Sequence, residues 1–456
     1  MTGDEELELL ADADARALHY VAGVDGMRVY PDENAIAGLA AFDEDLPRIG
    51  RDPATTIELL DRVGSPATAV SNGPRYFGFV IGAALPAAAA AERLALAWDQ
   101  CASSFDNSPV AATIESIAAR WVLDILDLPR QAAIGFGTSA TACAISCLAA
   151  ARRKLLARAS WDVDGDGLAG APAIRVVAPM SAHITIKKAL RLLGFGLSKI
   201  EFAPVDAQAR MRIDSAPHFD DRTIVCLQAG EVNTGEFDHF APVIERARAV
   251  GAWVHIDGAF GLWARASSKM KALTEGVENA DSWTTDGHKW LNTPYDSAMA
   301  ICRDADALAS TMNSDAAYAT ASKSAQKNLT MEFSRRARGL PIWAALRSLG
   351  REGVAEMVER HCAQAERLAE GLRDAGYEVC NRVVLNQVLV RAGSDAETIA
   401  VREAAQKSGE IWFGPTVWEE RSAFRLSVSS WRTTDADIDR AIALLRALKN
   451  VVSRTD

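Results

Sequence analysis

The sequence predicts an α/β protein with a mostly parallel sheet and helices on both faces, followed by a smaller α+β C-terminal domain. Between about residues 76 and 310, short apolar runs typical of buried strands alternate with helical segments. Such alternation indicates parallel strands joined by crossover helices. After residue 331, long helical segments lead into two short strand-like runs, which is the pattern of an α+β unit.

Three parts are expected along the chain. Residues 1–75 have helical periodicity and end near the Gly and Pro residues of SNGPRYFGF, so we expect an N-terminal helical arm. A large domain should follow over residues 76–330 and a small C-terminal domain over 331–456. The large domain's predicted helices are ALPAAAAAERLALAWDQ, IESIAARWVLDILDL, TIKKALRLLG and FAPVIERARAVG, and its predicted strands include AIRVVAP, TIVCLQA, AWVHID and SAMAIC. The predicted C-terminal strands are VVLNQVLVR and AFRLSVSS.

Composition and charge exclude several classes of function. The 456 residues are 49% apolar, which supports a large core. A net charge of -11 argues against a nucleic-acid partner, because binding to a phosphate backbone needs clustered Lys and Arg. There is no apolar run of about 18 residues, and the acidic N-terminal segment does not resemble a signal peptide, so no membrane partner is expected. The 7 cysteines form no CxxC pair, which favours reduced thiols and a cytoplasmic protein.

The segment DVDGDG, residues 162–167, imitates the start of a calcium-binding loop. The twelfth position of that loop would be Ala173, where calcium loops carry a bidentate glutamate. We therefore expect an acidic surface turn here and no metal site.

Small polar residues follow the first predicted strand of the large domain. In AAIGFGTSATACA, the chain passes through Ser139, Ala140 and Thr141 into a helix rich in small residues. Backbone amides at a helix N-terminus, together with the helix dipole, suit an anion such as phosphate. A simple Ser/Thr cap on an Ala-rich helix is the alternative interpretation.

Three more polar features lie at or beside strand ends, where open parallel sheets bind their ligands. His183 follows AIRVVAP at the start of a helix, where a histidine is often structural. Asp257 ends AWVHID, and a buried carboxylate needs a cationic or hydrogen-bonding partner. Lys289, in TTDGHKWLNTPYD, lies on a tight connection where an amine can lose its proton and act as a nucleophile. Together, these groups suit pyridoxal 5'-phosphate, which needs an anion site, a carboxylate for its ring nitrogen and a lysine for its aldehyde.

Several longer motifs follow one another along the chain. They are SAHITIKKAL, NTGEFD, HIDGAFG, DGHKWLNTPYD, SRRARGLPIWAALRSLG and FRLSVSSWRTT. In this order they resemble the group II pyridoxal-phosphate-dependent amino acid decarboxylases, the family of aromatic amino acid, glutamate and histidine decarboxylases. The resemblance covers most of the chain. It implies an aspartate aminotransferase-like fold of PLP fold type I with a seven-stranded sheet, and a homodimer with shared active sites.

The resemblance also implies an activity and a role for each matching residue. The activity is decarboxylation of an L-amino acid to its amine and carbon dioxide through aldimine and quinonoid intermediates. Lys289 would form the internal aldimine, Asp257 would keep the pyridine nitrogen protonated, and His183 would stack on the ring. The other implied cofactor contacts are Ser139, Ala140, Thr141, Asn233 at the end of a strand, Ala259 and His288.

Substrate contacts are implied for Tyr76, Phe77 and Arg425. Tyr318 matches the mobile-loop tyrosine that protonates the carbanion and reaches the site of the partner subunit. The chain departs from the family at Ser139 and Ala144, where many relatives have glycine and asparagine, and at Asp286, where asparagine is common. The loop after Tyr318 lacks the aromatic residues of the aromatic-substrate members, so the substrate stays open.

Other functions were weighed against decarboxylation. Oxidative decarboxylation to an aldehyde and an aldolase-type cleavage use the same cofactor, although Tyr318 argues against the aldehyde route. A metal hydrolase using His255, Asp257 and His288 would lack a third ligand at a suitable spacing. A non-catalytic dimeric scaffold is the remaining alternative.

Overall fold

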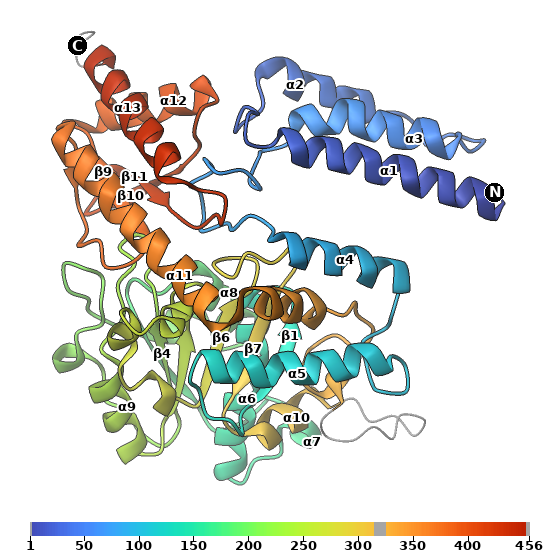
Figure 1. The fold of residues 1–456 in the computed structure, drawn as a ribbon. Coiled ribbons are helices and arrows are strands. Elements are labelled where there is room, and N and C mark those ends of the chain that lie inside the picture. Colours follow the sequence, from blue (N-terminus) through green and yellow to red (C-terminus); the bar gives the residue numbers. More distant parts are fainter. Residues whose placement is uncertain (1, 314–324, 453–456) are drawn as a thin grey trace. The chain divides into compact units, whose positions relative to one another are not determined.

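The computed structural model describes residues 2–313 and 325–452 (Figure 1). The chain forms two compact units. The large unit comprises residues 84–366 and 381–388, and the small unit comprises residues 1–83, 367–380 and 389–456. The three domains expected from the sequence, 1–75, 76–330 and 331–456, remain a proposal.

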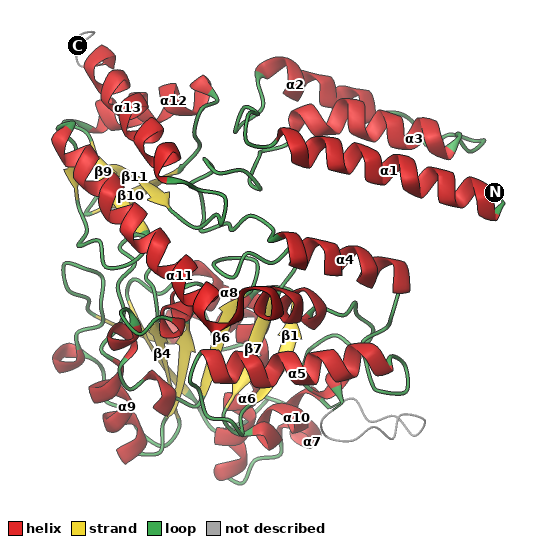
Figure 2. Cartoon of the chain, viewed as in Figure 1, coloured by secondary structure: helices red, strands yellow, loops and turns green. Residues whose placement is uncertain are grey.

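The large unit contains the predicted, mostly parallel sheet of seven strands (Figure 2). Its strands are β1 Ala133–Gly137, β2 Arg175–Pro179, β3 Ile200–Ala203, β4 Thr223–Gln228, β5 Trp253–Asp257, β6 Ser282–Asp286 and β7 Ala298–Cys302. They lie in the order β1-β7-β6-β5-β4-β2-β3, and β7 is antiparallel to both of its neighbours. The carboxyl ends of β1, β2, β4, β5 and β6 therefore meet at one edge of the sheet.

Helices cover this sheet (Figure 2). The helices of the large unit are α4 Pro86–Trp98, α5 Pro109–Ile125, α6 Ala140–Arg158, α7 Val163–Asp166, α8 Ile184–Leu192, α9 Phe240–Ala249 and α10 Ala305–Met312. Of these, α5, α6, α9 and α10 contact the strands directly. The α6 helix buries 11 of its 19 residues, most of them alanine and cysteine, and packs on β5, β6 and β7. Its small side chains let the helix lie close to the sheet.

The small unit consists of the helical arm and a second sheet. The arm contains α1 Gly3–Gly23, α2 Glu33–Gly38 and α3 Pro53–Leu59, none of which has a buried residue. The second sheet has the order β10-β11-β9-β8 and comprises β8 Glu378–Val379, β9 Gln387–Arg391, β10 Gly414–Trp418 and β11 Arg421–Ser427. The helices α12 Asp395–Ser408 and α13 Asp435–Val452 belong to the same unit, and α11 Gly339–Asp374 runs from the large unit into it.

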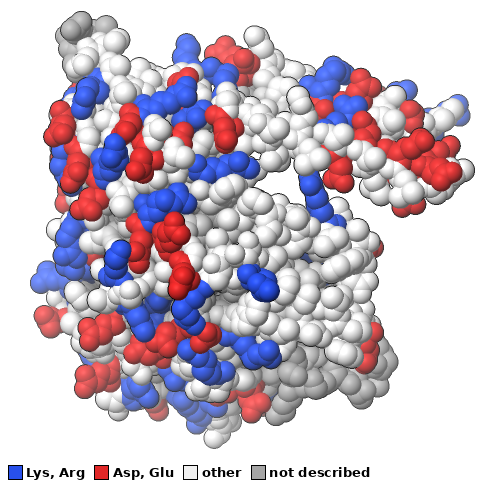
Figure 3. Space-filling view, viewed as in Figure 1, with Lys and Arg blue, Asp and Glu red and all other residues white. Residues whose placement is uncertain are grey.

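Figure 3 shows that charged side chains are unevenly distributed on the visible face. Acidic residues gather in the first turn of α1, at Asp4, Glu5 and Glu6. A broad area of the large unit around α4 and α5 carries few charges (Figure 3). None of the helices in residues 2–313 and 325–452 combines the length and the apolar character needed to cross a bilayer.

Candidate active site

Polar side chains converge at the carboxyl edge of the large sheet. Asp257 is the last residue of β5 and Asp286 is the last residue of β6. In the strand register, Gly137 of β1 and Asp286 of β6 both pair with Ala298 of β7, so the ends of β1 and β6 lie at the same level. The start of α6, which follows β1, is thereby brought beside Asp286.

Asp286 lies at the centre of this cluster. Its side chain is 3% exposed, with Oδ2 3.7 Å from His288 Nε2 and 4.0 Å from Lys289 Nζ. Its other oxygen, Oδ1, has no hydrogen-bond partner among the described residues. Burial raises the pKa of Asp286 to about 7, and the Asp257 carboxylate acts in the same direction. The Lys289 ammonium and the backbone amide of Ala140 act against this rise.

The connection that carries Lys289 is fixed at several points. Its Nζ lies 5.7 Å from the centroid of the Phe260 ring. The next residue, Trp290, is buried, and its indole N–H donates to His361 Nδ1 at 2.8 Å. The side-chain amide of Asn292 donates to the Trp290 carbonyl at 2.7 Å. These contacts hold the turn in one conformation and leave the lysine amine directed to the cluster.

His288 is a neutral member of the cluster at pH 7. Burial, together with the charge of Lys289, lowers the pKa of His288 to about 4. Its Nδ1 accepts the backbone N–H of Ser297 at 3.2 Å, so Nε2 carries the proton and faces Asp286. The ring stacks on Tyr295 with the centroids 4.2 Å apart, which fixes its orientation.

The start of α6 has the geometry of a capped helix and of an anion site at once. Ser139 is the N-cap, and its hydroxyl accepts the backbone N–H of Ala142 at 3.3 Å. The first amides of a helix, here those of Ala140 and Thr141, have no carbonyl partner within the helix. A side chain at Gly137 would meet Cys143 Sγ at 2.9 Å, so only glycine fits beneath the helix start. The two sequence-based interpretations are therefore compatible.

Ala259 links the ends of the two strands that carry the acidic residues. Its backbone N–H donates to Asp257 Oδ1 at 3.3 Å, and its carbonyl accepts the backbone N–H of Asp286 at 2.8 Å. The structure thus brings together four of the predicted site residues, Ala140, Asp257, His288 and Lys289, around Asp286.

His183 begins α8, immediately beyond β2. Its ring accepts the backbone N–H of Thr185 at 3.4 Å and lies 2.7 Å from the Thr185 hydroxyl. The histidine therefore serves as the N-cap of α8 and lies at the same edge of the sheet as Asp257.

The prediction that Asn233 ends a strand is wrong. Strand β4 stops at Gln228, and Asn233 lies in the turn that follows. The Glu231 carboxylate accepts the backbone N–H groups of Asn233 and Thr234, both at 2.8 Å, and the side-chain amide of Asn233 at 3.2 Å. This buried acceptor shapes the turn, because it satisfies amides that a strand would have paired with its neighbour.

The three predicted substrate contacts all belong to the small unit. Tyr76 stacks on Trp412 with the ring centroids 4.8 Å apart. The carbonyl of Phe77 accepts the backbone N–H of Ser427 at 2.8 Å, and Arg425 is a buried residue of the same strand, β11. Tyr318 lies outside the described residues.

His255 does not join the cluster. It pairs in register with Ser282 at the other end of β6 from Asp286, and its Nδ1 lies 3.0 Å from the Ser282 hydroxyl. Burial lowers the pKa of His255 to about 3. Within residues 2–313 and 325–452, no group of three or more His, Cys, Asp or Glu side chains is placed to hold a metal ion.

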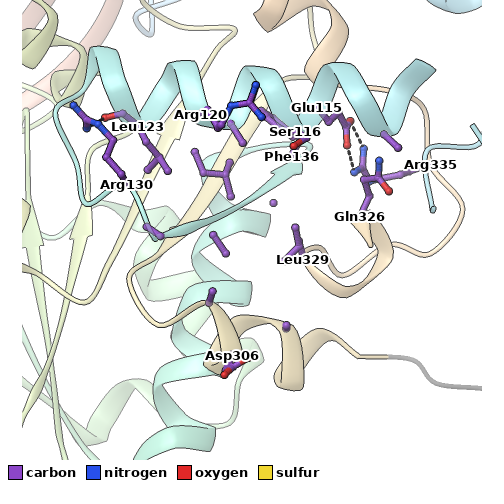
Figure 4. A pocket seen from close by; sticks show the side chains of 18 residues that line it. Glu115, Ser116, Arg120, Leu123, Arg130, Phe136, Asp306, Gln326, Leu329 and Arg335 are labelled. Atoms are coloured by element: carbon purple, nitrogen blue, oxygen red, sulfur yellow. Dashed lines mark hydrogen bonds and ion pairs between the residues drawn. The ribbon is translucent and has the colours of Figure 1, made fainter. Parts of the chain in front are cut away.

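A cavity of about 330 Å³ lies between α5, β1 and α10 (Figure 4). Arg335 donates to both oxygens of Glu115 at 2.8 and 2.7 Å, and this ion pair closes one end of the cavity. None of the predicted site residues is among the 18 residues that line it. The lining is largely apolar, and its Arg335 and Glu115 side chains are already paired with each other. We therefore interpret this cavity as a gap in the packing beside the edge strand β1.

Asp286 is the residue of the cluster that the sequence did not identify as a site residue. The available signal was its place in DGHKW, two residues before His288, where the chain departs from the asparagine that is common in the family. Trp290 and His361 also escaped notice, because they lie 71 positions apart in the sequence and no local pattern shows their contact.

The chain is similar to several known proteins. Residues 40–392 match the family model described as the pyridoxal-dependent decarboxylase conserved domain. The chain is 27% identical over 398 residues to tryptophan decarboxylase 1 of Oryza sativa subsp. japonica, covering 78% of this chain and 76% of that relative. It is also 27% identical over 433 residues to L-2,4-diaminobutyrate decarboxylase of Rhizobium meliloti (strain 1021), covering 89% and 84%. A crystal structure of Oryza sativa TDC with PLP and tryptamine superposes with a TM-score of 0.90 and 23% identity over 99% of both chains.

Proposed function

Because this chain belongs to the pyridoxal-dependent decarboxylases, a family of carboxy-lyases that use pyridoxal 5'-phosphate, we propose that it converts an L-amino acid to the corresponding amine and carbon dioxide. The observation that carries the proposal is the convergence of Lys289, Asp257 and the start of α6 at one edge of the sheet. An amine, a carboxylate and an anion-binding helix start are the groups that this cofactor requires.

The residues of the cluster fit the cofactor. Asp286 Oδ1 is a buried polar atom without a partner among the described residues, and the Asp286 carboxyl group lies beside the backbone amide of Ala140. Buried polar atoms are normally satisfied, so an unpartnered one indicates a bound group. When bound, pyridoxal 5'-phosphate supplies an electrophilic aldehyde and a conjugated ring that accepts the electrons of the broken bond.

Lys289 and Asp257 would have the two main roles. The Lys289 amine would hold the aldehyde carbon covalently and would be displaced by the amino group of the substrate. The Asp257 carboxylate, which Ala259 orients through its N–H, would keep the pyridine nitrogen protonated. A positive charge on the ring stabilises electrons arriving from the Cα–carboxylate bond, so Asp257 would lower the barrier to loss of carbon dioxide.

The other cofactor contacts extend this arrangement. Ser139, Ala140 and Thr141 would hold the phosphate, helped by the neutral ring of His288. His183 would stack on the pyridine ring, and Ala259 and Asn233 would complete the contacts. Each of these assignments rests on the position of the residue in its motif.

The substrate contacts and the proton donor are proposed in the same way. Tyr76, Phe77 and Arg425 would contact the substrate, and Tyr318 would return a proton to Cα. The relatives act on side chains as different as those of tryptophan and 2,4-diaminobutyrate, so the side chain of the substrate has to be found by experiment.

The proposal is tested by the absorbance and the products of the purified protein. With pyridoxal 5'-phosphate, we expect a visible band that borohydride abolishes and that Lys289→Ala never shows. The matched control is Lys269→Ala, an exposed lysine paired with Glu359, which should keep the band. A screen of L-amino acids should then give carbon dioxide and amine in equal amounts. Absence of the band would refute the proposal, and an aldehyde product would favour oxidative decarboxylation instead.

We also propose that the protein is a cytoplasmic homodimer. The α1 helix buries no residue and exposes Leu7, Leu10 and Leu18, which lie along one face of the helix. The large unit separately exposes Leu94, Leu96 and Trp98 of α4, in the area of low charge seen in Figure 3. Exposed apolar patches of this kind mark protein interfaces. The seven free cysteines support a reducing compartment.

A further inference from the structure

The Asp286 carboxyl group has an unusual position for an acid. It is 2% exposed, it ends a fully buried strand, and its Oδ1 has no partner among the described residues. It lies beside the amide of Ala140, the first residue of α6, where the proposed function places the phosphate. An ionised carboxylate there would compete with the phosphate for the same helix start.

The groups that face Asp286 do not neutralise it. From β5, Asp257 brings a second negative charge, and Lys289 on the following turn brings the one positive charge at 4.0 Å. His288 is neutral, and burial raises the pKa of the Cys143 thiol of α6 well above its usual range. Desolvation raises the pKa of the Tyr295 hydroxyl to about 12, so this group is also uncharged. With the cofactor bound, the pyridinium nitrogen would pair with Asp257 and the Lys289 amine would be bonded to the cofactor. An ionised Asp286 and the phosphate dianion would then repel each other at the start of α6, which is electrostatically unfavourable.

We propose that Asp286 binds the cofactor as a neutral carboxylic acid whose O–H donates a hydrogen bond to the phosphate at the start of α6. This inference rests on the proposed function. Protonation removes the competing charge and converts Oδ1 or Oδ2 from an acceptor into a donor, which is what a phosphate oxygen requires. The protonated form of Asp286 would then bind the cofactor tightly, and the ionised form would bind it weakly.

The direction of the pH dependence follows from proton linkage. Without cofactor, burial raises the pKa of Asp286 to about 7, so below that pH the required proton is already present. Above it, the proton must be taken up when the cofactor binds. Affinity should therefore be constant on the acidic side and should fall about tenfold with each pH unit on the alkaline side.

The test is the dissociation constant of pyridoxal 5'-phosphate between pH 6 and pH 8.5, measured for the wild type and Asp286→Asn. Asparagine has the same shape and always offers a donor. The ratio of the two constants cancels the titration of Lys289 and of the cofactor itself. We expect a ratio near 1 at pH 6 and of roughly 30 in favour of the variant at pH 8.5, since 1.5 pH units correspond to that factor. The control is Asp281→Asn, which changes a carboxyl group immediately before β6 that accepts the backbone N–H of Val254; it should behave like the wild type.

A second measurement uses the wild type alone and needs no correctly folded variant. Sulfate keeps its double negative charge across this pH range, so the dissociation constant of sulfate, obtained from its competition with pyridoxal 5'-phosphate, should rise as the pH rises above 7. A pH-independent ratio, together with pH-independent competition by sulfate, would overturn the role of Asp286. If the wild type and Asp286→Asn both fail to bind pyridoxal 5'-phosphate at every pH, the proposed function itself fails.

Discussion

The carboxyl edge of the large sheet and the N-terminal arm distribute their side chains in opposite ways. At the sheet edge, charged groups are buried, with Asp257 6% and Asp286 2% exposed. In the arm, apolar groups are exposed, with Leu7 67% and Leu46 95% exposed. Both regions are exceptions to the usual partition of polar and apolar residues, and such exceptions are more informative than the rule.

The difference indicates two kinds of partner. A buried acidic group with an unpartnered oxygen suits a small charged molecule that supplies the missing hydrogen bond. Exposed leucines on a helix face suit a protein surface. A change at the sheet edge should therefore alter chemistry and leave association intact, whereas a change in the arm should act first on association.

Asp257→Asn should have the largest effect. It tests whether a change at the sheet edge alters the chemistry and leaves association intact. Asparagine keeps the volume and can still accept the N–H of Ala259, but it removes the negative charge. Loss of one such electrostatic group lowers kcat by about 10²- to 10³-fold. Carbon dioxide release measures this loss, and sedimentation should give an unchanged dimer. A loss of less than tenfold would show that Asp257 does not stabilise charge on the ring.

Much of the fold could be predicted because the strands of a parallel sheet are buried on both faces and therefore read as continuous apolar runs. AWVHID is such a run, and all five residues of β5 are buried. Strand β3 was not predicted, since only two of its four residues are buried and its sequence has no apolar continuity. A strand could thus be recognised from the sequence only where its apolar residues formed a long enough continuous run.

The site was predictable in part, for a related reason. Asp257 was found because it ends an apolar strand, and Lys289 because its connection leads into the apolar run SAMAIC. Both signals are properties of a single segment. The importance of Asp286 depends on three elements at once: β5 with Asp257, the turn with Lys289 and the start of α6. No local pattern contains that information. The turn at Asn233 was missed because a single buried acceptor, Glu231, determines it.

The double variant Leu7→Asp with Leu18→Asp tests the arm half of the comparison. The two leucines lie three turns apart on one face of α1, and they are 67% and 55% exposed. Burying a leucine contributes about 1.5–3 kcal/mol, so each change should weaken a dimer at least about tenfold, and both together about 100-fold. Sedimentation across a concentration series measures this weakening. His19→Asp adds one such charge on another face of the helix and serves as the control for a single substitution.

The activity of the same double variant tests whether the active sites are shared between subunits. If the active sites are shared between subunits, activity should fall in parallel with dissociation and recover at high protein concentration. A fully active monomer would separate the two regions completely and would contradict the shared sites. An unchanged dimer would show that the leucines of α1 are not at the interface.

His183 should give the smallest effect, and it separates two roles of one side chain. As the N-cap of α8 it accepts the N–H of Thr185, so His183→Ala should lower the free energy of unfolding by about 1 kcal/mol. His183→Asn restores an acceptor and should restore the stability. Neither variant keeps a ring that can stack, and loss of a stacked aromatic pair, about 1 kcal/mol, should lower activity in both by roughly fivefold to tenfold. Thermal unfolding and carbon dioxide release measure the two effects separately. If asparagine restores activity as well as stability, His183 acts only as the N-cap of α8. The His183 ring would then have no stacking role in the active site.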